Sequence, residues 1–315
     1  MIYQLTHTST YAYSGRVARS HQLLRLTPRT TALQHCTKQQ ISIEPAPSEQ
    51  NDYADYFGNP TRYANVDALH ETLVVTATSR ISVDQDLRLL PDPGPTWERV
   101  RDALPHDRTA EGLYAYQFVY ESPMVPVHPR LREFALASFP PGRPLLEACS
   151  DLNQRIFHEF DYDPASTTIS TPVTQVLEQK SGVCQDYAHL MISCLRSLGL
   201  AARYVSGYVR PISSAIAAPD PQAVAGLSPE HPSSAPDQDY ENRGASASHA
   251  WLSVYAVDAG WIDFDPTNQA RPGHLKTDHI TLAWGRDYTD VAPIKGVSLG
   301  GGAHTISVEV EIKEA

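Results

Sequence analysis

The chain has 315 residues, of which 41% are hydrophobic and 19% are charged, and its net charge is −11 at pH 7. This length is sufficient for two domains, and the composition is that of a globular protein. The acidic balance argues against binding to nucleic acid or to an anionic membrane surface. No apolar run in the sequence approaches the roughly 20 residues that a membrane span needs, so we expect no membrane partner.

The N-terminus and the cysteines predict a cytoplasmic protein. Residues 1–7 contain no basic segment followed by an apolar core, which argues against a secretory signal. The cysteines show no paired spacing, which suits a reducing compartment; they are Cys36, Cys149, Cys184 and Cys194. The sequence contains no C-x-x-C or H-E-x-x-H motif and its 13 histidines are scattered. We therefore predict no metal and no cofactor.

Residues 1–95 are predicted to form a β-sandwich-like domain. Runs rich in β-branched and aromatic residues alternate with turn residues in this region. The expected strands are residues 2–8, 22–27, 37–43, 59–66 and 72–83. Gly58, Asn59 and Pro60 are typical of a hairpin bend, and the prolines of residues 91–95 mark the end of the domain.

The remainder is predicted to divide into a connecting segment, residues 96–140, and a second domain, residues 141–315. A helix is expected through residues 145–160, and the last strand at residues 305–312. A long stretch rich in Pro, Ser and Ala, residues 211–247, interrupts the second domain. A loop of this length is either functional or a solvated excursion, and its composition leaves both alternatives open.

Cys184 stands at the start of a strongly predicted helix. The apolar residues after it recur at helical spacing up to Leu198, and Gly199 is placed to end the helix. Gly182 allows a sharp turn into the first residue. Free backbone N–H groups and the helix dipole at this position favour an anion, so they favour a thiolate and an oxyanion beside it. A lone cysteine is more often a small buried residue, and only the histidine and the carboxylate downstream in the chain favour a reactive one.

His249 and Asp265 are predicted to meet on a hairpin. The run from His249 alternates in polarity, residues 257–260 resemble a turn, and the returning strand ends at Pro266. If Tyr255 pairs with Trp261, Asp265 lies diagonal to His249 on the same face, within reach of a hydrogen bond. A cysteine, a histidine and a carboxylate in this order are the components of a thiol nucleophile with its base.

Each of these residues also has an ordinary interpretation. A half-exposed histidine and aspartate on a surface hairpin would have no special role. Asp263 is a rival for the carboxylate, because it shares a face with Asp265 two residues earlier. Trp251 is predicted either to flank the site or to pack in the core. We prefer Asp265, since its register brings it nearer to His249.

Together these motifs resemble the transglutaminase-like superfamily. They comprise a Gly-x-Cys helix start at residues 182–184, His-Ala-Trp at residues 249–251 and Asp-Pro-Thr at residues 265–267. The flanking segments resemble a bacterial branch of the family; they are residues 2–7, 184–189, 202–208, 285–291 and 300–304. The resemblance covers nearly the whole chain, although residues 211–247 are longer than the family pattern requires. It implies an α+β fold with a papain-like core, in which a nucleophile helix packs on an antiparallel sheet.

The resemblance implies the roles of three residues: Cys184 is the nucleophile, His249 the general base and acid, and Asp265 the orienting carboxylate. The implied reaction is acyl transfer at a carboxamide or peptide bond through a thioester, on a peptide, a protein or a small amide. A cysteine peptidase or amidase using the same triad is the alternative, and a non-catalytic binding or scaffold protein is the second.

Several features stay open at this point. One oxyanion donor is unassigned, because neither Tyr162 nor Gln179 has a signal strong enough to choose it. Some members of the family outside bacteria use calcium, but no acidic loop with EF-hand spacing is present, so we predict none. The oligomeric state is not predicted.

Overall fold

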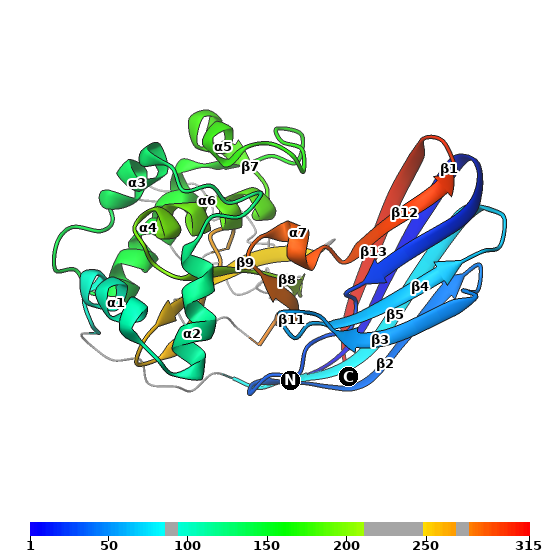
Figure 1. Cartoon of the computed structure of the whole chain (residues 1–315), viewed down its shortest axis with the longest axis horizontal. Helices are drawn as coiled ribbons and strands as arrows, with labels where there is room; N and C mark the ends of the chain where they lie inside the picture. The colour runs from blue at the N-terminus through cyan, green and yellow to red at the C-terminus, as the bar shows by residue number, and fades with distance from the viewer. Residues whose placement is uncertain (86–93, 211–247, 269–276) are drawn as a thin grey trace, which may run out of the picture.

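The computed structural model describes residues 1–85, 94–210, 248–268 and 277–315, and it has two lobes (Figure 1). One lobe consists of strands, and the other combines helices with an antiparallel sheet, so the predicted α+β class is confirmed. The long segment at residues 211–247 lies outside the described residues, as do most of the prolines at 91–95. Within the described part of the chain, no helix is long and apolar enough to cross a membrane.

The N-terminal lobe is built around one long strand. The strands of its first part are β1 (Ile2–Leu24), β2 (Gln34–Glu44), β3 (Glu49–Ala54), β4 (Pro60–Val66) and β5 (His70–Val83). They are ordered β2-β5-β1-β4-β3. β1 replaces two separately predicted strands, and β3, which is exposed throughout, was not predicted. The expected bend at residues 58–60 is present, with Gly58 at a φ of 74°.

The two halves of β1 belong to two layers of strands. Its first half pairs with β5 along one edge, and its second half pairs with β4. Side chains from both layers meet in a small apolar core; its buried members are Leu24, Leu26, Ile43, Ala64, Val66, Leu73, Val75 and Ala77. This arrangement agrees with the predicted β-sandwich-like domain.

The last two strands return to this lobe, which corrects the predicted domain boundary. β12 (Ile294–Gly300) pairs with the second half of β1, and β13 (His304–Glu314) pairs with its first half. Residues 294–314 therefore belong to the N-terminal sheet, although 141–315 was predicted as one domain. The turn between β12 and β13 uses three glycines at positive φ, Gly300, Gly301 and Gly302. The free edges of β1 explain the pairing, because unpaired strand edges leave backbone groups unsatisfied.

The predicted connecting segment, residues 96–140, is a helical part of the second lobe. It contains α1 (Trp97–Ala103), α2 (Ala110–Tyr116), α3 (Pro129–Leu136) and two 3-10 turns, Leu104–His106 and Gln117–Val119. Trp97, Leu131 and Phe139 are buried in the same core as the helix that begins at Cys184. Because this apolar surface is removed from water within that core, the segment is part of the second lobe rather than a linker.

The second lobe places a buried helix against a four-stranded sheet. Its helices are α4 (Leu145–Glu159), α5 (Val173–Gln179), α6 (Cys184–Ser197) and α7 (Tyr288–Val291). The sheet has the order β10-β9-β8-β11, with β8 (Ala202–Val209), β9 (His249–Ala256), β10 (Gly260–Phe264) and β11 (His279–Gly285). Two short parallel strands, β6 (Asp161–Tyr162) and β7 (Ser181–Gly182), lead into α6. Every residue of α6 from Asp186 onward is buried, so α6 is the centre of the lobe.

The seam between the lobes is hydrogen-bonded through two side-chain amides. Gln34 accepts from Thr281 N–H (2.8 Å) and donates to Thr281 O (2.8 Å). Asn59 bonds the N–H and the C=O of Trp284 in the same way, at 3.0 and 2.9 Å. These amides satisfy the outer edge of β11 as another strand would. A buried His7 adds a bond from β1 to Tyr208 of β8 (2.8 Å).

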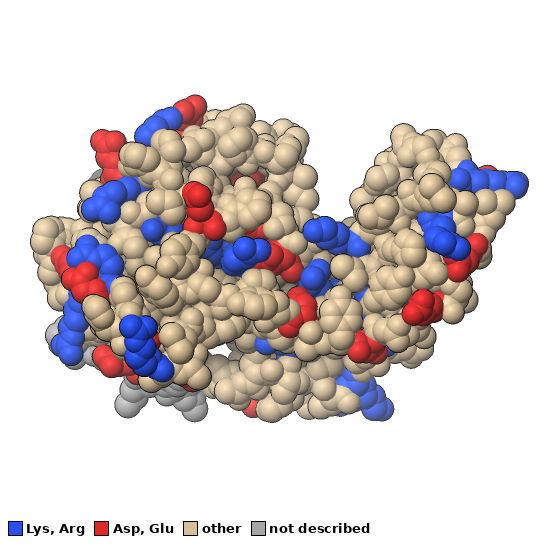
Figure 2. All heavy atoms as spheres, in the orientation of Figure 1, with Lys and Arg blue, Asp and Glu red and all other residues tan. Residues whose placement is uncertain are grey.

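The lobes separate on the other side of this seam. A hollow lies between them in the space-filling view, and residues of both charge signs are mixed over the face shown (Figure 2). In the same orientation, β12 and β13 are the strands of the N-terminal lobe that lie nearest to α7 (Figure 1).

Candidate active site

Cys184 is the first residue of α6, as predicted, and its side chain is partly exposed. The helix start is held by Asp186, whose carboxylate accepts from Val183 N–H (2.9 Å) and from Thr167 Oγ1–H (2.6 Å). Gly182 is required here, because a Cβ would lie 2.8 Å from the Asp186 carboxylate. The buried Asp186 was not predicted as a site residue. It fixes the turn that presents Cys184 at the helix N-terminus.

The hairpin that carries His249 has the predicted register. Tyr255 pairs with Trp261, and Leu252 pairs with Phe264. His249 Nε2 and Asp265 Oδ2 lie 2.8 Å apart, so the predicted hydrogen bond is present. Both side chains are fully buried. The local pattern of strand, turn and proline stop was therefore sufficient to predict this contact.

Asp265 is held by a dense set of donors. Its Oδ1 accepts from the backbone N–H groups of Thr267 (2.9 Å) and Asn268 (3.3 Å), and its Oδ2 accepts from Asn268 Nδ2 (2.9 Å). Burial disfavours the carboxylate, but the charges and hydrogen bonds of His249 and of a second histidine, His279, outweigh that effect. They hold the pKa of Asp265 well below its usual range. The carboxylate is therefore ionised and fixed in orientation.

His249 is positioned between Asp265 and Cys184. Burial opposes its charged form, yet the charge and hydrogen bond of Asp265 and the proximity of Cys184 raise the pKa of His249 to about 10. Its second nitrogen, Nδ1, is buried and has no hydrogen-bond partner among the described residues. Nε2 is engaged by Asp265, so Nδ1 is the imidazole nitrogen that is not engaged by the carboxylate.

Asp263, the rival carboxylate, belongs to a different contact. It accepts a hydrogen bond from Ser253 Oγ, and its charge stabilises the buried guanidinium of Arg203. Arg203 lies over the rings of Trp261 (4.3 Å) and Trp284 (3.8 Å). Asp263 is therefore part of a buried cation–aromatic group, and Asp265 is the partner of His249.

Trp251 lies beside the histidine and is also a core residue, so both predicted roles apply. Its ring stacks on His249 with centroids 6.0 Å apart, and it is completely buried. Gly207 of β8 makes this possible, because a Cβ there would lie 2.5 Å from the Trp251 ring. The indole thus crosses β8 and limits the movement of the imidazole.

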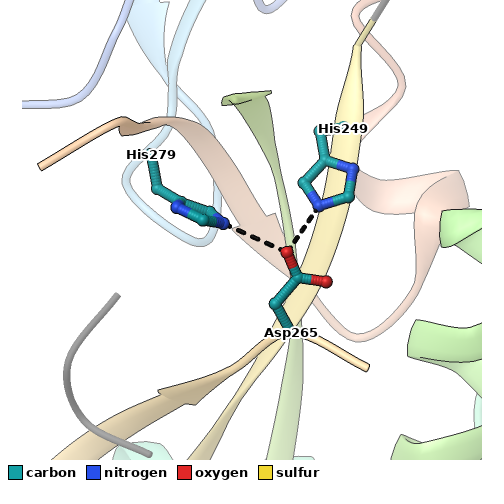
Figure 3. A group of neighbouring side chains, drawn as sticks. All are labelled: His249, Asp265 and His279. Carbon is teal, nitrogen blue, oxygen red and sulfur yellow. Dashed lines mark hydrogen bonds and ion pairs between the residues drawn. The ribbon is translucent and has the colours of Figure 1, made fainter. Parts of the chain in front are cut away.

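A second histidine, which the sequence did not predict for the site, joins the same carboxylate. His279 Nε2 lies 3.1 Å from Asp265 Oδ2, and His279 Nδ1 lies 3.0 Å from Asp278 Oδ1. Figure 3 shows Asp265 between the two imidazoles, with both contacts made by one oxygen. The only available signal was a histidine before an apolar run, because the position of His279 depends on the pairing of β11 with the distant β8.

Among the described residues, these three side chains are also the group that most resembles a set of metal ligands. The nitrogens of His249 and His279 and an Asp265 oxygen lie within 4.8 Å of one another. However, both nitrogens direct hydrogen bonds at one oxygen instead of converging on a common centre. We therefore interpret the group as a hydrogen-bonded cluster.

A cavity lined by described residues lies next to this cluster, on the side of Trp251 and His279. It has a volume of about 1060 Å³ and lies between the N-terminal lobe and the face of the sheet opposite α6. Trp251, His279, Arg203 and Asp263 contribute to its walls, and residues 31–34 close it from the N-terminal lobe. Cys184 and His249 are absent from the lining, so this cavity is distinct from the thiol side of the site.

Comparison with known proteins agrees with this architecture. Residues 3–82 match the bacterial transglutaminase-like N-terminal region, and residues 138–266 match the transglutaminase-like superfamily. The fold is similar to a crystal structure of a candidate cysteine protease from Cytophaga hutchinsonii, with a TM-score of 0.70 and 18% sequence identity. That similarity covers 99% of this chain and 90% of the other.

Sequence relatives extend over the whole chain. The uncharacterized protein Rv2569c of Mycobacterium tuberculosis is 36% identical, over 98% of this chain and 92% of its own length. A protein-glutamine gamma-glutamyltransferase of Pseudomonas aeruginosa is 24% identical over 154 residues, which is 46% of this chain and 20% of that protein. The chain therefore belongs to the transglutaminase-like superfamily and carries that superfamily's bacterial N-terminal region.

Proposed function

We propose that the protein is a cysteine acyltransferase that acts at a carboxamide or peptide bond through a thioester on Cys184. The observation that carries the proposal is the placement of His249, which is bonded to Asp265 through Nε2 while Nδ1 remains for the thiol. His249, whose pKa is raised to about 10, holds a proton at neutral pH. A protonated imidazole beside a cysteine at a helix start favours the thiolate–imidazolium pair.

Acylation begins with attack of the Cys184 thiolate on the carbonyl carbon of the substrate. A sulfur–carbon bond forms, and the oxyanion is stabilised by the backbone N–H of Cys184 at the start of α6. His249 then gives its proton to the departing nitrogen as the carbon–nitrogen bond breaks. The products of this half-reaction are a thioester and free amine or ammonia.

Deacylation reverses the proton path. A primary amine or water attacks the thioester and gives its proton to His249, the sulfur–carbon bond breaks, and the thiolate–imidazolium pair is restored. Asp265 keeps the imidazole oriented in both halves of the cycle. An amine acceptor gives transamidation, whereas water gives deamidation when the bond broken is a side-chain carboxamide and proteolysis when it is a peptide bond.

The test is mass spectrometry of a glutamine-containing peptide library incubated with a primary amine. Wild type is compared with Cys184→Ala and with Cys36→Ala, a control that removes another free and partly exposed thiol, which lies on β2 of the N-terminal lobe. Amine adducts made by wild type and Cys36→Ala, and absent with Cys184→Ala, are the expected result.

Two other results would change the proposal. Cleaved or deamidated peptides, made without amine adducts and dependent on Cys184, would identify a cysteine peptidase or amidase with the same three residues. Equal product from wild type and Cys184→Ala would contradict a role for the thiol, and no product from either protein would favour a binding or scaffold protein.

A further inference from the structure

A buried polar pair, Asp278–His279, lies next to the three proposed catalytic residues. His279 begins β11 and is 8% exposed, and Asp278 is 6% exposed. The two His279 nitrogens face one carboxylate each, Asp265 at 3.1 Å and Asp278 at 3.0 Å. Since ionised carboxylates only accept hydrogen bonds, both nitrogens must carry protons to satisfy both contacts. His279 in this arrangement is an imidazolium.

Four groups form a line of alternating charge. It runs from Asp278 through His279 and Asp265 to His249, and the two imidazoles meet the same Asp265 oxygen (Figure 3). In the proposed function, the Cys184 thiolate continues this line. Such an array is favourable in a buried site, because each charge inside the line lies between two charges of opposite sign. Removing one member leaves its neighbours with uncompensated charge.

The sheet brings His279, at the start of β11, to Asp265, directly after the end of β10, across the two intervening strands β9 and β8. His279 pairs with Val209 of β8, and Gly207 of β8 pairs with His249 of β9. Because Gly207 has no side chain, the Trp251 ring lies over β8 and meets the edge of His279, with centroids 5.2 Å apart. The contact thus depends on the arrangement of all four strands of the sheet.

We propose that His279 is a positioning residue for the reaction: it fixes the Asp265 oxygen that orients His249, and Asp278 fixes His279 in turn. This inference rests on the proposed function, because it concerns the same Cys184–His249 pair. His279 also shares the negative charge of Asp265, so Asp265 stabilises the proton on His249 less strongly. The His249 imidazolium therefore stays acidic enough to protonate a leaving amine.

Other charged groups near His279 belong to further contacts. Arg210 donates from its backbone N–H to Asp278 O (3.0 Å) and pairs through its guanidinium with Glu314 (3.0 Å). Asp84 and Asp263 line the same cavity as His279, and Asp263 supports Arg203. Tyr3 from β1 lies near Asp278 as well, and burial raises the pKa of its hydroxyl.

The experiment measures carboxymethylation of Cys184 by iodoacetate against pH, with the modified peptides quantified by mass spectrometry. The negative reagent is attracted by the His249 imidazolium, so its rate falls when His249 loses its proton, whereas neutral iodoacetamide does not sense that charge. Cys36 in the same molecule is the internal reference. The variants are His279→Gln, which keeps an N–H donor without the charge, His279→Phe, which keeps a ring without a donor, and the exposed control His106→Gln.

For His279→Phe we expect a loss of about 10-fold or more in the Cys184 rate at pH 6 to 7, with a smaller loss for His279→Gln. For His279→Gln we also expect a higher pKa for His249, because a positive charge beside Asp265 is gone. The fall in the iodoacetate rate at alkaline pH should therefore move to higher pH. Loss of packing alone would not move that fall upward. Thermal unfolding of each variant shows which ones are folded.

The outcomes separate this inference from the proposed function. If folded His279→Phe and His279→Gln both match wild type in rate and in pH profile, the positioning role is wrong while the proposed function stands. If wild-type Cys184 reacts no faster than Cys36 at pH 6, the proposed function itself fails. A stoichiometric divalent metal in purified wild type that disappears in His279→Phe would overturn the hydrogen-bonded arrangement.

Discussion

Two buried histidines in different regions of the molecule have opposite properties. His7, at the seam between the lobes, is hydrogen-bonded to the hydroxyl groups of Tyr208 and Ser9, and burial lowers its pKa to about 4. His249, in the candidate site, is buried as deeply, but Asp265 raises its pKa to about 10. Neutral hydroxyl partners leave the desolvation penalty uncompensated, whereas a carboxylate reverses its effect.

The comparison explains why one region is structural and the other is suited to chemistry. The seam contains neutral amides, hydroxyls and a neutral imidazole, so it holds the lobes together without titrating near pH 7. The site contains alternating charges and a nitrogen of His249 that has no partner among the described residues. Such an arrangement is costly to bury and is retained where function requires it.

Replacing each histidine should give the largest contrast. We expect His249→Gln to lose activity by on the order of 10⁴-fold, because both the thiolate partner and the proton donor disappear. His7→Gln should retain the activity of wild type, since the seam does not contact the thiol. Steady-state rates on the peptide identified with the glutamine library provide the measurement. A His249→Gln enzyme with near wild-type rates would remove the basis of the comparison.

Replacing the Asp265 carboxylate by an amide should give His249 a lowered pKa, as His7 has. Asp265→Asn removes the charge that opposes desolvation, so the pKa of His249 should fall below its usual 6.5, and activity should fall about 10³- to 10⁴-fold. Asp263→Asn is the matched control, because Asp263 supports Arg203 instead. NMR titration of the His249 imidazole measures the first effect. An unchanged titration would show that Asp265 is not the cause of the raised pKa.

Stability should decline on acidification because of His7. Its folded pKa of about 4 lies below the usual 6.5, so its contribution is present above pH 6.5 and is lost as pH falls through 4. The full difference corresponds to at most about 3 kcal/mol. His189, whose burial also lowers its pKa to about 4, acts in the same direction.

Urea unfolding of wild type and His7→Gln between pH 7 and pH 4 checks this contribution. The stability of His7→Gln should depend less steeply on pH than that of wild type. His249 has the opposite sign, because its contribution is lost as pH rises through about 10. Parallel pH dependence in both proteins would show that His7 does not titrate as its environment implies.

The smallest expected effect concerns the seam amides. Gln34→Ala leaves the Thr281 N–H without its partner and removes one of the two donors to the Thr281 C=O, the other being Arg29 N–H, which should cost about 1–3 kcal/mol in the free energy of unfolding. Gln40→Ala, on the exposed part of the same strand, is the control and should change stability by less than about 0.5 kcal/mol. Equal urea midpoints for the two variants would mean that the Gln34 side-chain amide does not stabilise the edge of β11.

Local sequence was sufficient for the parts of the site that are close in the chain. Helical periodicity after Cys184 and the short turn before Trp261 fixed the helix and the hairpin, so His249 and Asp265 were placed correctly relative to each other. Alternation along one strand determines which side chains share a face, and a short turn determines the register.

Contacts between distant segments were not predictable in this way. His279 reaches Asp265 only because β11 adds to β8, and β12 and β13 pair with β1 at the opposite end of the chain. No local pattern identifies the partner of a strand. The prediction therefore assigned residues 294–314 to the second domain, which was wrong. Gln34 and Asn59 were missed for the same reason, since polar residues near turns are usually solvated. The predicted cytoplasmic location and the absence of nucleic-acid and membrane partners stay predictions.

The central claim is that Cys184 is activated by a protonated His249. The most direct measurement is the iodoacetamide alkylation rate of Cys184 at pH 6, relative to Cys36 in the same molecule, for wild type and His249→Ala. In wild type Cys184 should react at least about 10-fold faster than Cys36, and His249→Ala should remove that advantage. Equal rates for the two cysteines in wild type, or an advantage that survives in His249→Ala, would contradict the account.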